Sequence, residues 1–293
     1  MSAADILEFR AMGTAWWIRA DGAATAFPAV RALVEREEQR CSRFRPDSVL
    51  SCLNRRRFVH DARLAALVRR ALRLRRLTGG AFDPTLGDAM RAAGYDRDFQ
   101  SLPELCLTWA PPVERLRVRV AGERVALEGP GSLDLGGIAK GATVDAVAAL
   151  LRARGCPTFC IDAGGDLRAE GPGPDGEGWR IGVGPDPEDE SGATLAVSLR
   201  DAAVATSSTL RRRWATPSGT AHHILAPACG APAASGVTVA TVVAADAATA
   251  DALATALIAD PAAVLAAPPG IAALLCRDNA WVMTPAMEAV LEC

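Results

Sequence analysis

The segment that most constrains the fold is Leu133 to Leu151, which reads LDLGGIAKGATVDAVAALL. Leu133 and Leu135 predict a short apolar strand that runs into the paired glycines Gly136 and Gly137. An apolar stripe at helical spacing follows and predicts a helix that packs one face on a core. The stripe consists of Val144, Val147, Ala148 and Leu151. The chain must therefore place a glycine turn between an extended segment and a partly buried helix.

This turn has the residues of an anion site. Lys140 and Gly141 fall in the first turn of the predicted helix, where unpaired N–H groups and partial positive charge favour phosphate. Lys140 would strengthen that site, and Asp134 offers a carboxylate to a hydroxyl, an amide or a metal. The alternative, an ordinary strand–turn–helix unit whose glycines serve tight packing, stays open at this point.

Composition limits the classes of protein. The chain has 293 residues, half of them hydrophobic, and a net charge of −2, which describes a globular protein with a large core. With no basic excess, one Tyr and seven Phe, it shows no sign of nucleic-acid binding. Runs of arginine indicate solvated faces or, alternatively, phosphate contacts. These runs are Arg55 to Arg57, Arg69 to Arg76 and Arg211 to Arg213.

The spacing of the cysteines and the first residues of the chain indicate in which cellular compartment the protein is expected. The eight cysteines form no C-x-x-C pair and no zinc-finger spacing, so we expect neither a zinc site nor a disulfide framework. The opening MSAADILEFRAMGT has no basic region, apolar region or cleavage site of a signal peptide, and no lipobox. No stretch reaches about 18 apolar residues. We expect a cytoplasmic enzyme without membrane insertion.

Residue patterns predict the other elements along the chain. Strands are expected at Ile6 to Arg10, Ala15 to Ala20, Thr158 to Asp162, Trp179 to Val183, Thr194 to Leu199, His222 to Pro227 (leading into a turn) and Val237 to Ala244, with a hairpin at 113–127. Helices are expected at Ala24 to Arg40, from the cap Asp61 to Thr78-Gly79-Gly80, and at Ala247 to Ala259.

Three further positions carry candidate chemistry. Asp83 precedes Pro84, which holds it extended and leaves its carboxylate free to point into a cleft, unless the pair only starts a turn and helix. Asp251 and Thr255 are spaced i, i+4 on one helical face and supply hard oxygen ligands suited to Mg²⁺ or Ca²⁺. A solvent-facing Asp beside a Thr bonded to its own backbone is the alternative.

Eight segments together resemble the ApbE family of FAD:protein FMN transferases, in family order and along nearly the whole chain. The segments are MGT at Met12 to Thr14, SRFRPDSVLSCLN at Ser42 to Asn54, GGAFDPTLG at Gly79 to Gly87, LDLGGIAKGATVD at Leu133 to Asp145, DAGGDLRAEG at Asp162 to Gly171, VATSS at Val204 to Ser208, HHILAP at His222 to Pro227, and ADALATAL at Ala250 to Leu257.

The resemblance implies a Mg²⁺-dependent reaction on FAD. FAD is cleaved at its pyrophosphate, FMN passes to a Ser or Thr hydroxyl of an acceptor protein, and AMP leaves. The implied flavin contacts are Met12, Phe44 (usually Tyr in the family), Ala81, Phe82, Asp83, Asp134, Lys140 and Ile224. The implied metal ligands are the Gly137 carbonyl, Asp251 and Thr255. His223 falls on the family's histidine and is the candidate base for the acceptor hydroxyl.

One departure from the family pattern bears on activity. The usual HIIDPRTG reads HILAPACG here, so Ala226, Ala228 and Cys229 replace the Asp, Arg and Thr. If the missing Asp orients the histidine, transfer is weakened or lost while FAD and Mg²⁺ binding persist. The alternative function is then a flavin-binding member that stores or hydrolyses FAD, and a further one is a structural homologue that does neither.

The resemblance also implies the fold. We expect an α+β architecture related to the T-fold, with mainly antiparallel sheets flanked by helices, as one domain over residues 1–293 with two lobes and a cleft between them. Family acceptors resemble D-x-x-[ST]-G-A-[ST], and Glu188 to Thr194 (EDESGAT) fits this motif except at Glu188. Flavinylation of the chain's own Thr194 is therefore a second, weaker expectation, since chance matches to short motifs are common.

Overall fold

The computed structural model describes residues 4–106, 108, 116–183, 195–265 and 271–292. Its largest element is an eight-stranded sheet in the order β1-β2-β6-β7-β10-β13-β14-β15, antiparallel throughout. The strands are β1 (Ala4–Ala11), β2 (Thr14–Asp21), β6 (Phe159–Asp162), β7 (Asp166–Glu170), β10 (Ala202–Ser208), β13 (Val237–Ala244), β14 (Ala272–Arg277) and β15 (Ala280–Met283). This sheet and the helices below confirm the expected α+β class.

Three smaller sheets, also antiparallel, accompany the large one. One has the order β16-β9-β8, one the order β3-β5-β4, and one is the hairpin β11-β12. Their strands are β3 (Phe58–His60), β4 (Arg117–Ala121), β5 (Arg124–Glu128), β8 (Trp179–Val183), β9 (Leu195–Leu199), β11 (Arg213–Thr216), β12 (Gly219–His222) and β16 (Leu291–Glu292).

The helices pack mainly beside one face of the large sheet. They are α1 (Phe27–Cys41), α2 (Val49–Arg56), α3 (Ala62–Leu77), α4 (Gly87–Ala92), α5 (Ala139–Ala153), α6 (Ala247–Ala259), α7 (Pro261–Leu265) and α8 (Pro285–Glu288), with 3-10 turns at Ala24–Ala26 and Phe99–Ser101. Within the described residues, no helix combines the length and the hydropathy that crossing a membrane requires.

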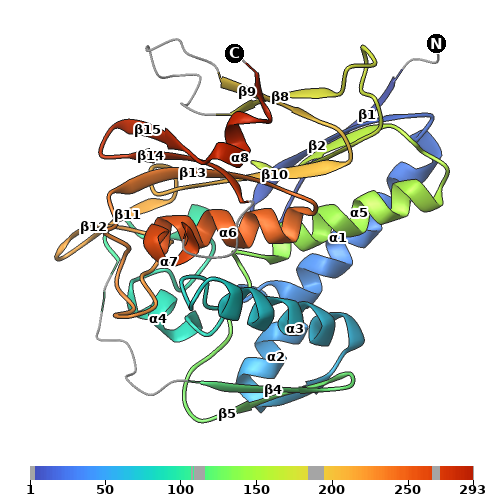
Figure 1. Ribbon diagram of the computed structural model, residues 1–293. Helices are drawn as coiled ribbons and strands as arrows, with labels where there is room; N and C mark the ends of the chain where they lie inside the picture. The colour runs from blue at the N-terminus through green and yellow to red at the C-terminus, as the bar shows by residue number, and fades with distance from the viewer. Residues whose placement is uncertain (1–3, 107, 109–115, 184–194, 266–270, 293) are drawn as a thin grey trace.

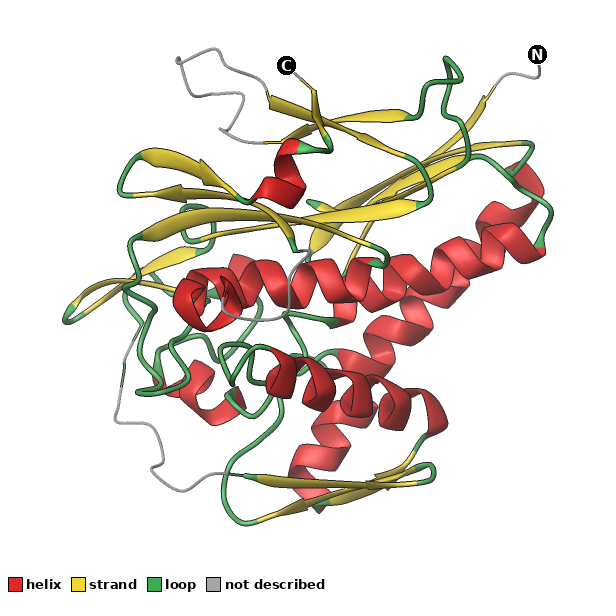
Figure 2. Cartoon of the chain, in the orientation of Figure 1, coloured by secondary structure: helices red, strands yellow, loops and turns green. Residues whose placement is uncertain are grey.

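The elements form layers around the large sheet (Figures 1 and 2). Helices α5 and α6 pack on one face, where α6 contacts β10 and β13 and α5 contacts β7. Helix α8 and the β16-β9-β8 sheet lie over the other face, as their shared hydrophobic cluster shows. Helices α2 and α3 and the β3-β5-β4 sheet lie farther out on the α6 side. Helix α3 therefore lies between α6 and the small β3-β5-β4 sheet.

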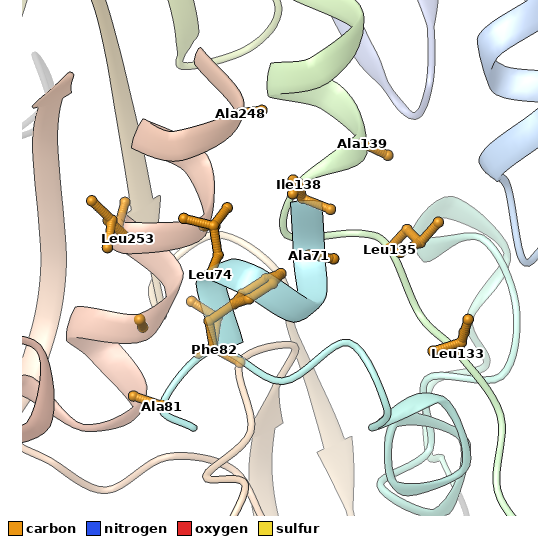
Figure 3. Close-up of a cluster of buried hydrophobic side chains, with 14 of the residues drawn as sticks. Ala71, Leu74, Ala81, Phe82, Leu133, Leu135, Ile138, Ala139, Ala248 and Leu253 are labelled. Atoms are coloured by element: carbon orange, nitrogen blue, oxygen red, sulfur yellow. The ribbon is translucent and has the colours of Figure 1, made fainter. Parts of the chain in front are cut away.

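The central hydrophobic core joins α3, α6 and the 133–139 segment. Figure 3 shows Phe82 in a cluster of side chains from these three parts, and the residues of this cluster that are named next are less than a tenth exposed. They include Leu74 of α3, Leu135 and Ile138 of the glycine-turn segment, and Leu253 of α6. Because Phe82 is fixed by this core, its neighbour Asp83 is held in place as well.

Most of the predicted elements are present. The strand pieces around Met12-Gly13-Thr14 form the β1–β2 hairpin, whose turn places both Met12 and Gly13 at positive φ (53° and 71°). Asp61 accepts from the Leu64 N–H at 2.7 Å and caps α3 as expected. The hairpin at 113–127 is present as β4–β5, although residues 113–115 and Thr194 lie outside the described residues.

Two predicted strands are wrong in part. Leu133 and Leu135 lie in an extended segment without a strand partner, because the side-chain amide of Asn54 takes the place of a neighbouring strand. Asn54 Nδ2 donates to the Leu133 carbonyl at 2.9 Å, and the Leu133 N–H donates back to Asn54 Oδ1 at 2.8 Å. At the second site, β12 ends at His222, so residues 223–227 form a loop.

Candidate functional site

A cavity of about 950 Å³ receives side chains from all eight motif segments. Its lining includes all twelve candidate catalytic, flavin-binding and metal-binding residues: Met12, Phe44, Ala81, Phe82, Asp83, Asp134, Gly137, Lys140, His223, Ile224, Asp251 and Thr255. The loop at residues 223–227 and the turns at 12–14 and 164–165 border the same space. The fold therefore gathers these scattered motifs at one site.

A buried ion cluster forms the polar end of the cavity. Lys140 lies in the first turn of α5, as expected, and its Nζ is 2.5 Å from Asp166 Oδ2 and 3.9 Å from Asp251 Oδ2. Burial by itself would lower the pKa of Lys140, but the charges of Asp166 and Asp251 outweigh burial and raise it. Lys140 is thus a charged, paired cation rather than the free anion ligand that the helix start suggests.

Asp251 faces this cluster from α6. Only 3% of Asp251 is exposed, so the alternative of a solvent-facing Asp is wrong. Burial, reinforced by the neighbouring Asp166 carboxylate, raises the pKa of Asp251. Its Oδ2 accepts from the Gly141 N–H at 3.3 Å, which ties α6 to the first turn of α5.

The candidate metal ligands lie next to one another. A Cβ built on Gly137 would be 3.1 Å from Thr255 Oγ1, so the Gly137 backbone lies directly against that hydroxyl. Thr255 Oγ1 is also 3.3 Å from Ser207 Oγ at the end of β10. Within the described residues no three His, Cys, Asp or Glu side chains gather as a metal site. The protein would therefore offer one carboxylate, one hydroxyl and one carbonyl.

Asp83 lines the cavity but its carboxylate is not free. Its Oδ2 pairs with Arg75 Nε at 2.9 Å, and its Oδ1 accepts from both the N–H and the hydroxyl of Thr85. The carboxylate is therefore fixed against α3, and the expectation that it is free to point into the cleft is wrong. Asp83 presents a rigid acceptor at the cavity wall.

The apolar end of the cavity is aromatic. Phe44 and Tyr95 lie with ring centroids 5.4 Å apart, and Tyr95 lies 5.1 Å from Trp214. Arg43 packs its guanidinium 4.2 Å from the Phe44 centroid and pairs through Nε with Asp134 Oδ2 at 2.6 Å. Asp134 also accepts from the Gly136 N–H at 2.6 Å, which fixes the carboxylate over the glycine turn.

His223 is neutral in this structure. Burial, then the positive charges of Arg212 and Lys140, lowers the pKa of His223 to about 3. Its Nδ1 is buried and has no hydrogen-bond partner within the described residues. Arg212 itself forms no ion pair within those residues, and its Nη2 lies 3.5 Å from the Gly13 carbonyl. A neutral imidazole therefore lies in a cavity that also holds an uncompensated cation.

The comparisons with known proteins agree with this gathering of motifs. The model of the ApbE family matches residues 12–275, most of the chain. The chain belongs to the ApbE family. The FAD:protein FMN transferase of Vibrio cholerae serotype O1 is 31% identical over 241 residues, covering 77% of this chain and 70% of the relative. That of Treponema pallidum is 33% identical over 253 residues, covering 79% and 70%.

Solved structures of the ApbE family share the whole fold. The ApbE protein of Thermotoga maritima has a TM-score of 0.83 at 27% identity, covering 98% of this chain and 99% of that one. The flavin transferase ApbE from Vibrio cholerae has a TM-score of 0.81 at 24% identity, covering 99% and 100%. The α+β architecture expected from the resemblance is thus confirmed.

The departure from the ApbE family pattern leaves the backbone of the loop intact. The Ala226 carbonyl accepts from the N–H groups of Cys229 and Gly230 at 3.2 and 2.8 Å, so a tight turn closes without the usual side chains. What is lost is the carboxylate at position 226. The buried, unpartnered Nδ1 of His223 lies three residues upstream of that position.

Sequence reasoning missed several residues of this ApbE-family site. Asp166 stood out only as one residue of the segment Asp162 to Gly171, yet it pairs with Lys140 at 2.5 Å. Arg43, Tyr95 and Arg212 carried no individual signal, although the run Arg211 to Arg213 admitted a phosphate contact. The Gly-Gly pair before Asp166 repeats the Gly-Gly pair that precedes Lys140, and this repetition is the signal that points to Asp166.

Proposed function

We propose that the protein is a FAD:protein FMN transferase that acts at this cavity. In the proposed reaction, FMN passes from FAD to a Ser or Thr hydroxyl of an acceptor protein and AMP is released. The curated relatives from Vibrio cholerae and Treponema pallidum bear the name FAD:protein FMN transferase. Family membership together with the gathered site supports the same reaction here.

The observation that carries the proposal is the division of one cavity into two chemically different ends. Phe44, Tyr95 and Ile224 line an apolar end that suits a planar ring such as isoalloxazine. Lys140 and the hydroxyls near Thr255 line a polar end that suits a pyrophosphate, and the charge of Arg212 acts on both Lys140 and Tyr95, so it reaches both ends. FAD has this same division between an extended aromatic system and a charged linkage.

The residues present fit a magnesium ion that is shared with the substrate. Mg²⁺ is usually held by one or two carboxylates together with substrate phosphates, and the cavity offers Asp251, Thr255 and the Gly137 carbonyl. All three ligands are oxygens, which matches a hard cation. When bound, the ion would neutralise charge on the pyrophosphate and its leaving group.

The protein's own groups supply the remaining chemistry. Neutral His223 accepts the proton of the acceptor hydroxyl as its oxygen bonds to the FMN phosphorus. The bond from that phosphorus to the bridging oxygen breaks, and AMP leaves with that oxygen. Arg212 and the first turn of α5 bind the phosphates. Lys140 pairs with the carboxylates of Asp166 and Asp251 and so fixes their positions.

The acceptor is proposed to be a protein segment of the form D-x-x-[ST]-G-A-[ST]. The family resemblance is the support for this motif. The chain's own near-match ends at Thr194, which lies outside the described residues.

Product analysis tests the proposed function. The purified protein is incubated with FAD, Mg²⁺ and a peptide that carries the acceptor motif, and the nucleotides and peptide are separated by chromatography. We expect AMP and an FMN-bearing peptide in equal amounts. Free FMN plus AMP would instead show a hydrolase, and unchanged FAD that co-elutes with the protein would show a storage protein.

A further inference from the structure

The cavity holds one buried donor that the proposed chemistry leaves unused. Arg43 is held by its Nε on Asp134 at 2.6 Å, and its side chain is only 11% exposed. Its Nη2 is buried and has no hydrogen-bond partner within the described residues. A buried guanidinium N–H without an acceptor is destabilising, and Arg43 lines the cavity, so a ligand atom would supply the acceptor that Nη2 lacks.

The surroundings of Arg43 limit what that ligand atom is. The guanidinium carbon lies 4.2 Å from the Phe44 centroid and 4.6 Å from the Tyr95 centroid, so flat apolar surfaces flank the donor. Asp134 already neutralises the Arg43 charge and would repel a phosphate placed beside it. The donor therefore suits a neutral acceptor on a planar ring better than it suits an anion.

The pair of Arg43 and Asp134 presents a donor next to an acceptor. The pyrimidine edge of isoalloxazine carries two carbonyl oxygens on either side of one N–H group. Adenine, the other ring of FAD, has no carbonyl oxygen, and its own acceptor beside a donor is the ring nitrogen N1 next to the amino group, so a comparison of FAD with ADP separates the two rings. A carboxylate accepts up to about four hydrogen bonds, so Asp134 keeps capacity for a ring N–H beyond Arg43 and Gly136.

We infer that Arg43 is a specificity-determining residue that donates through Nη2 to a pyrimidine carbonyl oxygen of the flavin ring. Asp134, fixed by Arg43, accepts the neighbouring ring N–H, and Phe44 and Tyr95 supply the apolar faces beside the ring. The inference rests on the proposed function, because it takes FAD as the ligand. It adds Arg43, which the family resemblance does not assign, as the residue that selects the flavin ring.

Ligand binding by three variants tests whether the guanidinium of Arg43 recognises the flavin. FAD affinity is measured by fluorescence titration, and ADP affinity by calorimetry, for the parent, Arg43→Met, Arg43→Lys and Arg55→Met. We expect both Arg43 variants to bind FAD roughly 10- to 100-fold more weakly, since a hydrogen bond to a charged group is lost, and to bind ADP unchanged. Arg55, on the exposed face of α2 and outside the cavity lining, is the matched control and should leave both affinities unchanged.

The Arg43→Lys variant separates recognition of the flavin from neutralisation of Asp134. Lysine keeps a positive charge for Asp134 but lacks the planar fork that reaches a second acceptor. Parent-like FAD binding by Arg43→Lys would show that Arg43 only neutralises Asp134, and would overturn the inference. An equal loss of ADP affinity in both variants would also overturn it, because it would indicate a general distortion of the cavity.

Altered flavins test the contact without changing the protein. In 2-thio-FAD and 4-thio-FAD one pyrimidine carbonyl oxygen is replaced by sulfur, a weaker acceptor. We expect one of the two to bind the parent about 10-fold more weakly than FAD and to bind Arg43→Met as FAD does. Equal weakening in parent and variant would contradict the contact. A parent that binds no FAD at all would overturn the proposed function itself, a result distinct from these.

Discussion

At the scale of single residues, the charge balance around Lys140 determines what the polar end of the cavity accepts. One buried ammonium faces two buried acids, Asp166 and Asp251, and burial raises the pKa of Asp251, so this acid favours its protonated form until a cation lies beside it. A divalent cation would favour the ionised form of Asp251 and would add positive charge next to the pyrophosphate. The site is therefore expected to bind the pyrophosphate together with its metal.

Replacing the candidate metal ligands tests this balance. Asp251→Ala and Thr255→Ala should each lower the Mg²⁺-dependent release of AMP by more than about 100-fold, because the metal's stabilisation of phosphoryl transfer is worth several kcal/mol. Thr249→Ala is the matched control, since Thr249 lies on the same helix and its hydroxyl contacts Arg70 outside the cavity lining. AMP release by the two ligand variants at the rate of Thr249→Ala would remove these residues as ligands.

His223 gives a prediction about pH. Its pKa in the folded chain is about 3, below the ordinary value of 6.5, chiefly because of burial. A lowered folded pKa means that the unfolded chain binds the proton first, so the stability tied to neutral His223 is full above pH 6.5 and falls as the pH drops toward 3. Urea unfolding of the parent and of His223→Gln, measured from about pH 8 down to about pH 4, tests this, because the ordinary pKa of 6.5 lies inside that range.

We expect the parent to lose more stability than His223→Gln across that range. Parallel pH profiles for the two proteins would show that His223 titrates normally. Transfer itself should disappear in His223→Gln, since no other side chain of the loop can take the hydroxyl proton.

Restoring the family carboxylate at position 226 should raise activity rather than lower it. His223 Nδ1 lacks a partner in the described residues, and the family carboxylate is missing three residues downstream. Ala226→Asp should therefore raise FMN transfer, by roughly 10-fold if the new carboxylate orients the imidazole as second partners of catalytic groups do. Initial rates with a fixed acceptor peptide decide this, with Ala226→Asn as the uncharged control. Strong transfer in the parent that Ala226→Asp leaves unchanged would show the carboxylate to be dispensable here.

At the scale of elements, the crossing of α5 and α6 builds the polar end. The two helices pack together where Gly141 meets the first turn of α6. A Cβ on Gly141 would lie 2.3 Å from the Ala247 carbonyl oxygen and 2.8 Å from the Ala248 Cα, both backbone atoms that cannot rotate away. Glycine is thus required for the approach that brings Lys140 within reach of Asp251.

Gly141→Ala tests this crossing. The two helices would have to move apart, and we expect a net loss of stability of roughly 1–3 kcal/mol despite the better helix propensity of alanine. FAD affinity should fall as well, because Lys140 and Asp251 would separate. Ala149→Ser, at an exposed position of the same helix, should change stability by no more than about 0.5 kcal/mol. Unfolding curves for both variants measure the difference, and a parent-like Gly141→Ala would contradict the close crossing.

Elements differ in how far the sequence predicts them. Helix α6 and strand β13 have the predicted bounds, Ala247–Ala259 and Val237–Ala244, because a continuous apolar run with a capping Asp246 sets both locally. The strand expected at Leu133 and Leu135 is absent because its hydrogen-bond partner is the Asn54 side chain, a contact between distant parts of the chain. Local patterns give the type of an element, while distant partners decide whether a strand pairs.

At the scale of the whole molecule, the sequence predicted which residues share a cavity but not how they pair. All twelve candidate residues line the cavity. They were chosen from motifs that follow the order of the ApbE family, whose model matches most of the chain. The partners of Lys140, Asp83 and Asp134 were not predictable, because Asp166, Arg75 and Arg43 reach them from other elements. Ion pairs of this kind depend on how separate elements pack together. The spacing of residues within one element does not predict that packing.

The measurement that tests the central claim most directly is the intact mass of an acceptor peptide after incubation with the protein, FAD and Mg²⁺. We predict that a peptide with the D-x-x-[ST]-G-A-[ST] motif gains one FMN through a phosphoester bond that survives denaturation, and that the same peptide with alanine at the final hydroxyl position gains none. An unmodified acceptor, in a preparation that binds FAD and Mg²⁺, would contradict the account.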